Sequence, residues 1–174
     1  MNSQSGTRAN RMTEGLAEIR QVTIFTDGAC IGNHGPGGYG VVLRYGKHRR
    51  ELSGGFRLTT NNRTEMMAAI VGLAVLKEKC AVTIYSGLQL PVDSILGGWV
   101  YESREMGWRR ENERLLNADL WKRLLELCGQ NEVQLIWVKG HSGEPQNERT
   151  HALSEHAACG DDLAIDRAYE EGRT

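Results

Sequence analysis

The order in which two hydrophobic periodicities occur constrains the fold of this chain more than any other feature. Three runs rich in β-branched and aromatic residues come first, separated by glycine-containing turns: residues 22–25, 39–45 and 50–57. From residue 62 to 80 the apolar residues recur at helical spacing, as Met66, Ile70 and Leu73 show. Further along, residues 81–86 and 133–138 are typical of strands, whereas residues 88–101, 119–128 and the segment from about Pro145 onward are typical of helices.

These elements predict an α/β fold. The three leading strands are linked by hairpins and are therefore antiparallel, whereas the two later strands alternate with helices. We expect a mixed five-stranded sheet flanked by helices, in one domain that spans residues 21–160. Residues 1–20 are polar and without clear period, so we expect a flexible leader there, and we expect residues 161–174 to form a C-terminal tail.

The composition argues against several classes of protein. No stretch approaches the roughly 20 consecutive apolar residues of a membrane span, and the N-terminal segment lacks the apolar centre of a secretory signal. We therefore expect a cytoplasmic monomer without membrane contact. The cysteines lie far apart and form no Cys-x-x-Cys pair, so they indicate neither a zinc site nor a redox dithiol: Cys30, Cys80, Cys128 and Cys159.

Two acidic residues lie where the predicted elements meet. Asp27 follows the first strand in Thr-Asp-Gly-Ala-Cys, where its side chain can point into a groove above the sheet. Asp-Gly is also a strong turn signal, which is the alternative interpretation. Glu65 falls in the first turn of the long helix, where it can instead close a capping box with Asn62.

Three motifs, residues 26–40, 59–70 and 137–143, occur in an order and spacing that is specific in combination. On these motifs the chain resembles bacterial type 1 ribonuclease H over about residues 21–160. The resemblance implies a ribonuclease-H-like fold. It also implies a nucleic-acid-binding hydrolase, an endonuclease that cleaves the RNA strand of an RNA/DNA hybrid with two Mg²⁺ or Mn²⁺ ions held by four carboxylates.

The resemblance assigns part of the active site. Asp27 and Glu65 match two of the metal-binding carboxylates, so we expect them to be catalytic residues and metal ligands. His141 matches a loop histidine that assists proton transfer or product departure. Gly87 and His151 occupy the positions of the other two carboxylates. Glycine offers no ligand, and imidazole suits zinc or other transition ions better than magnesium.

The charge at these positions favours a degenerate site. Two Mg²⁺ ions are formally balanced by four carboxylates, whereas Asp27 and Glu65 alone leave two excess positive charges. Because Mg²⁺ requires hard oxygen ligands in octahedral geometry, we expect weak or absent metal binding and lost or strongly impaired hydrolysis.

Alternatives remain open. His151 and Glu155 are four residues apart on one helix face and can rebuild a site for manganese or a transition ion, which would make the chain an active hybrid nuclease. A solvent-facing His151 is the simpler interpretation. An interaction module or a deliberately disabled variant would carry the same substitutions.

The resemblance also predicts contacts with the hybrid. Cys30, Asn33, Asn61 and Gln89 match residues that read 2′-hydroxyls and the minor groove, Thr60 matches part of a DNA phosphate pocket, and Trp108 belongs to a basic protrusion at residues 98–117. Asn61 alternatively caps the helix, and Asn33 lies in a glycine-rich turn. Between residues 101 and 114 four arginines are matched by four glutamates, so we expect weak hybrid binding.

Overall fold

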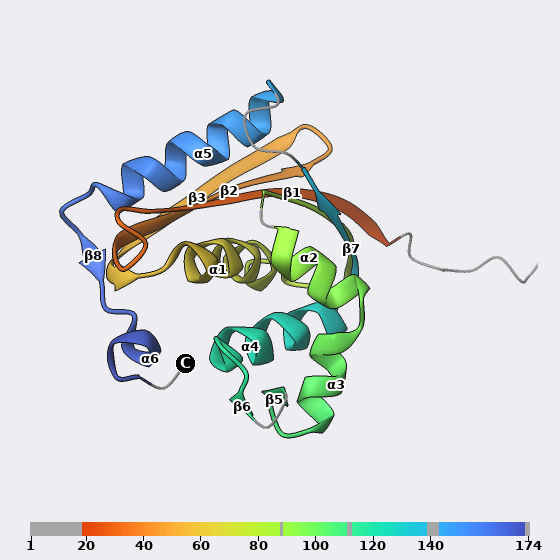
Figure 1. The fold of residues 1–174 in the computed structure, drawn as a ribbon. Helices are drawn as coiled ribbons and strands as arrows, with labels where there is room; N and C mark the ends of the chain where they lie inside the picture. The colour runs from red at the N-terminus through yellow and green to blue at the C-terminus, as the bar shows by residue number, and fades with distance from the viewer. Residues whose placement is uncertain (1–18, 88, 111–112, 139–142, 173–174) are drawn as a thin grey trace, which may run out of the picture.

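A six-stranded mixed sheet forms the centre of the protein (Figure 1). The computed structural model describes residues 19–87, 89–110, 113–138 and 143–172. The strand order is β7-β4-β1-β2-β3-β8, with β1 at Arg20–Cys30, β2 at Gly35–Tyr45, β3 at His48–Thr59, β4 at Cys80–Ser86, β7 at Glu132–Trp137 and β8 at Leu163–Ala164. The leading three strands pair antiparallel, whereas β4, β7 and β8 each pair parallel to their neighbours. The five predicted strands are present, and β8 adds a sixth.

Helices cover both faces of this sheet. Helix α5 (Pro145–Ala158) lies across β1, β2 and β3 on one face, and α1 (Asn61–Ala74) lies on the other face, followed outward by α4 (Ala118–Gly129) (Figure 1). Two glycines allow α5 to lie directly on β2. A Cβ atom at Gly38 would lie 2.4 Å from the carbonyl oxygen of Ser154, and one at Gly40 would lie 2.1 Å from that of Thr150. The glycines of this strand thus set the distance between sheet and helix.

The hydrophobic core fills the space between the sheet and α1. Ile24, Val41 and Ile84 from three adjacent strands are completely buried, as expected for inward positions of alternating strands. Leu73 of α1 and Leu124 of α4 are almost as inaccessible and extend the same core to the outer helix. Among the described residues, no helix is long and apolar enough to cross a membrane.

Two helix predictions need correction. The helix expected at residues 62–80 ends at Ala74, because the chain must turn before it enters β4 at Cys80. The helix expected at residues 88–101 is two helices, α2 (Gln89–Leu96) and α3 (Trp99–Glu105). Gly98 separates them with a φ of 79°, a left-handed conformation that favours glycine. Two short strands, β5 (Arg109–Arg110) and β6 (Glu113–Arg114), pair after α3.

The segment after residue 160, which the sequence predicts as a tail, includes β8 and the short helix α6 (Arg167–Glu170). A buried ionic cluster holds it to the domain. Arg63, only 2% exposed, donates hydrogen bonds to Asp166 at 2.7 and 2.8 Å and to Asp119 at 3.0 and 2.7 Å. Asp166 also accepts from the Thr59 hydroxyl at 2.9 Å. The cluster therefore joins α1, α4, β3 and the C-terminal segment.

Candidate active site

A pocket of about 230 Å³ opens where β1, β4, α1 and α5 meet. Asp27, Glu65, Gly87 and His151 all line it, together with Thr26, Gly28, Val138, Asn147, Glu148 and Thr150. The parallel pairing of β1 with β4 ends with Thr26 opposite Ser86, so Asp27 and Gly87 follow that pair on neighbouring strands. The structure thus brings together the four positions that the sequence singled out.

Glu65 points from α1 into the pocket instead of capping the helix. The N-cap of α1 is Thr60, whose hydroxyl accepts a hydrogen bond from the backbone N–H of Arg63 at 3.4 Å. The alternative interpretation, a capping box between Asn62 and Glu65, is therefore wrong. Gly28 permits the close approach of β1 to α1, because a Cβ atom there would lie 2.5 Å from the backbone nitrogen of Glu65.

The environment of Glu65 favours its protonated form. The side chain is buried, and within the described residues its Oε2 atom has no hydrogen-bond partner. Burial raises the pKa of the Glu65 carboxyl well above its ordinary value, and the negative charge of Asp27 raises it further. A hydrogen bond from the backbone of Gly28 opposes this shift only in part.

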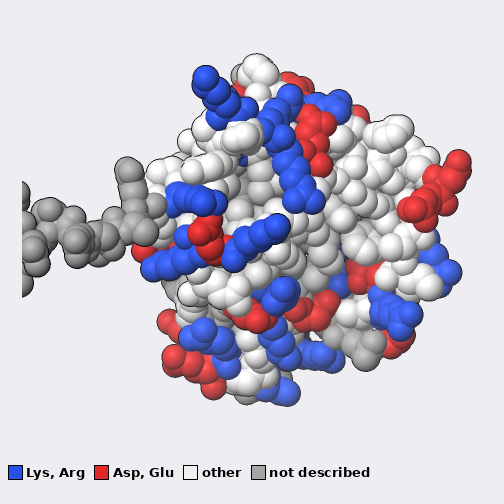
Figure 2. Space-filling model, turned by 180° about the vertical axis from the view of Figure 1, so that it is seen from behind, with Lys and Arg blue, Asp and Glu red and all other residues white. Residues whose placement is uncertain are grey.

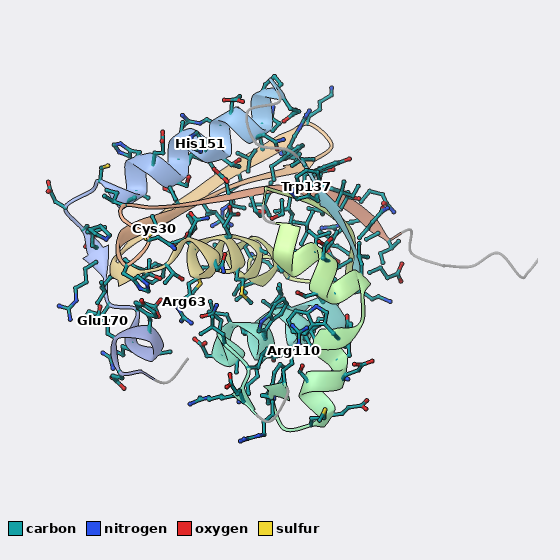
Figure 3. The ribbon with its side chains drawn as sticks, in the orientation of Figure 1. Cys30, Arg63, Arg110, Trp137, His151 and Glu170 are labelled. Atoms are coloured by element: carbon teal, nitrogen blue, oxygen red, sulfur yellow. The ribbon has the colours of Figure 1, made fainter. Side chains whose placement is uncertain are left out.

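His151 contacts Asp27 directly (Figure 3 shows its place on α5). Its Nδ1 atom lies 2.8 Å from Oδ2 of Asp27, and its Nε2 atom lies 3.4 Å from Oε1 of Glu155. The hydroxyl of Ser154 lies 3.4 Å from the same Asp27 oxygen and donates to the carbonyl of His151 at 2.8 Å. The simpler expectation of a solvent-facing histidine is therefore wrong, because α5 turns this ring toward the sheet.

The acidic neighbours favour the protonated form of His151. Desolvation is the largest single influence and lowers its pKa. The hydrogen bond and charge of Asp27, with the charges of Glu155 and Glu148, together outweigh this effect, so the pKa of His151 is raised above 6.5. An imidazolium cation therefore lies beside Asp27 around and below that pH.

Gly87 leaves space beside both acidic residues. A Cβ atom at this position would lie 3.3 Å from Oδ1 of Asp27 and 3.9 Å from Oε1 of Glu65. The backbone is held in place by Trp137, whose indole N–H donates to the carbonyl of Gly87 at 3.1 Å. A carboxylate side chain at residue 87 would therefore lie close to the carboxyl groups of Asp27 and Glu65.

Comparison with known proteins decides the family. The sequence profile of the RNase H family matches residues 19–159. The chain belongs to the RNase H family. It is 55% identical over 151 residues to a ribonuclease H of Syntrophus aciditrophicus, covering 86% of this chain and 87% of the relative. It is 46% identical to a ribonuclease H of Aeromonas salmonicida, covering 87% of this chain and 99% of the relative.

Solved structures agree with this assignment. LC9-RNase H1, described as a type 1 RNase H with the type 2 active-site motif, superposes with a TM-score of 0.73 at 26% identity, over 90% of this chain and 82% of that one. LC11-RNase H1 in complex with an RNA/DNA hybrid superposes with a TM-score of 0.58 at 21% identity, over 85% of this chain and 99% of that one, which supports the fold.

The residues in the pocket do not fit a pair of magnesium ions. The RNase H family is generally dependent on divalent metals, and two such ions need several oxygen ligands with negative charge. Here Gly87 contributes none, and one oxygen of Asp27 is hydrogen-bonded to His151. The buried Glu65 carboxyl is stabilised in its neutral form. Two of the four carboxylates that the family resemblance predicts are therefore missing, and Glu148 is the other acidic residue in the lining.

Four of the residues predicted to contact the hybrid lie around the start of α1. The backbone N–H of Asn61 donates to Oδ1 of Asn33 at 3.0 Å, and the thiol of Cys30 lies 3.5 Å from the carbonyl of Thr59. Asn33 has a φ of 54°, so its backbone adopts a turn conformation while its side chain contacts the start of α1. We call the group formed by Cys30, Asn33, Thr60 and Asn61 the rim. Thr60, the cap of α1, adjoins Asn61 on the same rim. The structure thus brings Cys30, Asn33, Thr60 and Asn61 together.

The other predicted residues are placed differently. Trp108 packs against the core cluster, and the ammonium group of Lys122 lies 5.6 Å from its ring centroid. Gln89 begins α2, but its side chain lies outside the described residues, as does the whole of His141. Sequence reasoning missed Ser154 beside Asp27, although its spacing of three residues from His151 already places both on one face of a helix.

Proposed function

We propose that this chain is an RNase H family protein that binds RNA/DNA hybrid weakly and has lost, or retains only in strongly impaired form, metal-dependent hydrolysis. One observation carries the proposal. Oδ2 of Asp27 lies 2.8 Å from Nδ1 of His151, while Gly87 supplies no side chain on the other side of the same carboxylate. The carboxylate that the RNase H resemblance assigns to metal is thus hydrogen-bonded to another side chain of the protein.

Charge balance supports this interpretation. When His151 is protonated, its positive charge lies beside Asp27, while Glu148 also lines the pocket and Glu155 lies 3.4 Å from the ring. A divalent ion entering this pocket would meet the imidazolium at short range, and repulsion is strong where solvent screening is reduced. The imidazolium thus offsets part of the negative charge of the pocket, which opposes the binding of hard cations.

Hybrid binding is proposed on the residues that remain. The rim of Cys30, Asn33, Thr60 and Asn61 offers neutral polar groups suited to the shape and 2′-hydroxyls of a hybrid. LC11-RNase H1, which shares the fold, was solved with an RNA/DNA hybrid. These groups need no metal to form hydrogen bonds, so the proposed binding is independent of divalent ions.

The proposed affinity is low because cationic side chains are offset by acids. In the protrusion, the guanidinium of Arg110 lies 4.7 Å from the ring centroid of Trp99, and its strand partner is Glu113. On the face shown in Figure 2, acidic side chains lie among the lysine and arginine side chains. Fewer displaced counterions imply a shallow dependence of hybrid affinity on salt.

A second candidate function is hydrolysis of the hybrid through a modified site. Relatives with about half of their residues identical are named ribonuclease H, which favours an active enzyme. Asp27 and Glu155 contact opposite ring nitrogens of His151, and among the described residues no group of three or more acidic, histidine or cysteine side chains is placed to hold one ion, so such a site would require His151 to move.

Cleavage of a labelled RNA/DNA hybrid separates the two functions. The unaltered chain, the double variant Gly87→Asp, His151→Asp and a matched control Gly87→Asn, His151→Asn are compared with Mg²⁺ and with Mn²⁺. The asparagine control fills the same space without charge and also reveals any contaminating nuclease. We expect the aspartate variant to exceed the unaltered chain on the order of a hundredfold or more.

Other results would decide against the proposal. Robust cleavage by the unaltered chain, above the asparagine control, would establish the second candidate instead. A hybrid titration without divalent ions tests the binding claim separately. Affinity for hybrid no greater than for double-stranded DNA of the same sequence would remove that claim.

A further inference from the structure

The C-terminal segment reaches the loop that carries Asn33. This loop, residues 31–34, joins β1 to β2, and the backbone N–H of Ile31 donates to the carbonyl of Pro36 at 2.8 Å. On one side, Oδ1 of Asn33 accepts from the backbone of Asn61 and so ties the loop to α1. On the other side, Nδ1 of His34 is hydrogen-bonded to the hydroxyl of Tyr169 on α6. The loop therefore lies between two anchors.

The contact between His34 and Tyr169 has the geometry of a stacked pair. The ring centroids lie 6.2 Å apart with an interplanar angle of 15°. Residues 34 and 169 are separated by almost the whole described chain, so only the packing of α6 onto the domain brings them together. Figure 3 shows Cys30, Arg63 and Glu170 at this same end of the molecule.

Several independent contacts hold Tyr169 in position. Asp166, buried in the ionic cluster with Arg63, caps α6 by accepting a hydrogen bond from the backbone N–H of Tyr169 at 3.5 Å. The guanidinium of Arg63 lies 5.8 Å from the Tyr169 ring centroid. The next residue, Glu170, pairs with Arg57 of β3 at 2.7 Å. A helix as short as α6 is marginal alone, so these contacts are what make it a rigid support.

We propose that Tyr169 and His34 are positioning residues for the hybrid-contacting loop, so that the C-terminal segment at residues 163–170 is part of the binding apparatus. The inference rests on the proposed function, since it assigns to this segment the placement of Asn33 for hybrid. The physical basis is preorganisation: a loop held in its bound conformation loses less entropy when the ligand arrives. Without the tyrosine hydroxyl, the loop loses its hydrogen bond to α6, while the bond of Asn33 to the backbone of Asn61 remains.

The test variant is Tyr169→Phe, which removes the hydroxyl and leaves the ring against Arg63. Tyr45→Phe is a matched control, because Tyr45 also stacks on a histidine, His48, at 6.4 Å and 13°, but at the far end of β2. His34→Ala and the double variant with Tyr169→Phe complete a cycle. Hybrid affinity is measured without divalent ions, thermal unfolding is followed in parallel, and amide hydrogen exchange is measured at residues 31–34.

We expect Tyr169→Phe to weaken hybrid binding about threefold to tenfold, the effect of one net hydrogen bond, and to speed exchange in residues 31–34. His34→Ala should weaken hybrid binding by a similar factor, and the double variant should bind no more weakly than either single variant. The Tyr45→Phe control should bind hybrid as the unaltered chain does. A merely structural role would lower the unfolding temperature of Tyr169→Phe but leave loop exchange unchanged, which would overturn the inference. If the unaltered chain binds hybrid no more tightly than double-stranded DNA, the proposed function fails. Amide exchange at residues 31–34 is then still informative: faster exchange in Tyr169→Phe supports the positioning of the loop, and unchanged exchange contradicts it.

Discussion

Oδ2 of Asp27 and Nδ1 of His151 lie 2.8 Å apart, and this contact joins the central strand β1 to the helix that covers it. The pair occupies the place where the RNase H family resemblance predicts two carboxylates around metal. A resident cation on the protein therefore replaces part of the charge that metal ions bring, and the stability of the domain should depend on it.

We expect His151→Ala to lower the free energy of unfolding by about 0.5–1 kcal/mol in metal-free buffer near pH 6, an amount discounted because a third of the side chain is exposed. The folded-state pKa of His151 is raised above 6.5, so its contribution is complete below pH 6.5 and is lost as pH rises through the folded-state pKa. Urea denaturation at several pH values measures this. His156→Ala, on the same helix but exposed, is the control, and a difference that grew with pH would contradict the account.

We expect Gly87→Asp alone to destabilise the metal-free protein by about 1–2 kcal/mol, because its carboxylate would extend beside Asp27 and Glu65. Added Mg²⁺ should recover part of that loss. Thermal unfolding with and without the ion provides the measurement, and Gly87→Asn provides the uncharged control. Equal responses of the two variants to Mg²⁺ would show that charge in the pocket is not what limits metal binding.

The ionic cluster around Arg63 should contribute more to stability than the pair of Asp27 and His151. Asp166→Asn should cost about 3 kcal/mol of unfolding free energy, because it leaves the buried guanidinium, 2% exposed, with less compensating charge. Glu170→Gln removes the half-buried partner of the exposed Arg57 on the same short helix and should have a much smaller effect, because the ion pair is open to solvent on the arginine side. Denaturant titrations of both variants compare them. Comparable losses would mean that α6 docks through its exposed pair rather than through the cluster.

The approach of α5 to the sheet predicts intolerance at Gly40. Gly40→Ala would place a methyl group 2.1 Å from the carbonyl oxygen of Thr150, so α5 must shift, at a cost of about 2–3 kcal/mol. Gly129→Ala is the matched control, since its Cβ atom would meet nothing within 4 Å. Chemical denaturation and crystallography of a stable variant check the prediction. A neutral Gly40→Ala would show that α5 is not fixed by this contact.

The sheet was predictable from local patterns, and the errors have identifiable causes. Alternating apolar residues located five strands, because each has a buried face. The helix at 62–80 was predicted too long because Lys77 and Glu78 favour helices locally, whereas the path into β4 ends α1 at Ala74. One helix was predicted at 88–101, although the glycine pair at 97–98 favours the break that separates α2 from α3. Strand β8, with two residues, is too short to show a period.

The site was predictable only in part. The resemblance to the ribonuclease H family predicted that Asp27, Glu65, Gly87 and His151 share one site, and in the structure all four line one pocket. The contact between His151 and Asp27 did not follow from sequence, because it depends on how closely α5 approaches β2. That distance is set by tertiary packing at Gly38 and Gly40, which no local pattern reports. The ionic cluster around Arg63 was missed for the same reason, since its partners lie far apart along the chain.

Thr26 and Ser86 are paired in the parallel register of β1 and β4, and the Thr26 hydroxyl donates to the carbonyl of Tyr85 at 3.3 Å, so the strand ends are joined before residues 27 and 87 are reached. Substitutions at residues 87 and 151 should therefore change the charge and the stability of the pocket while the order of the strands stays the same.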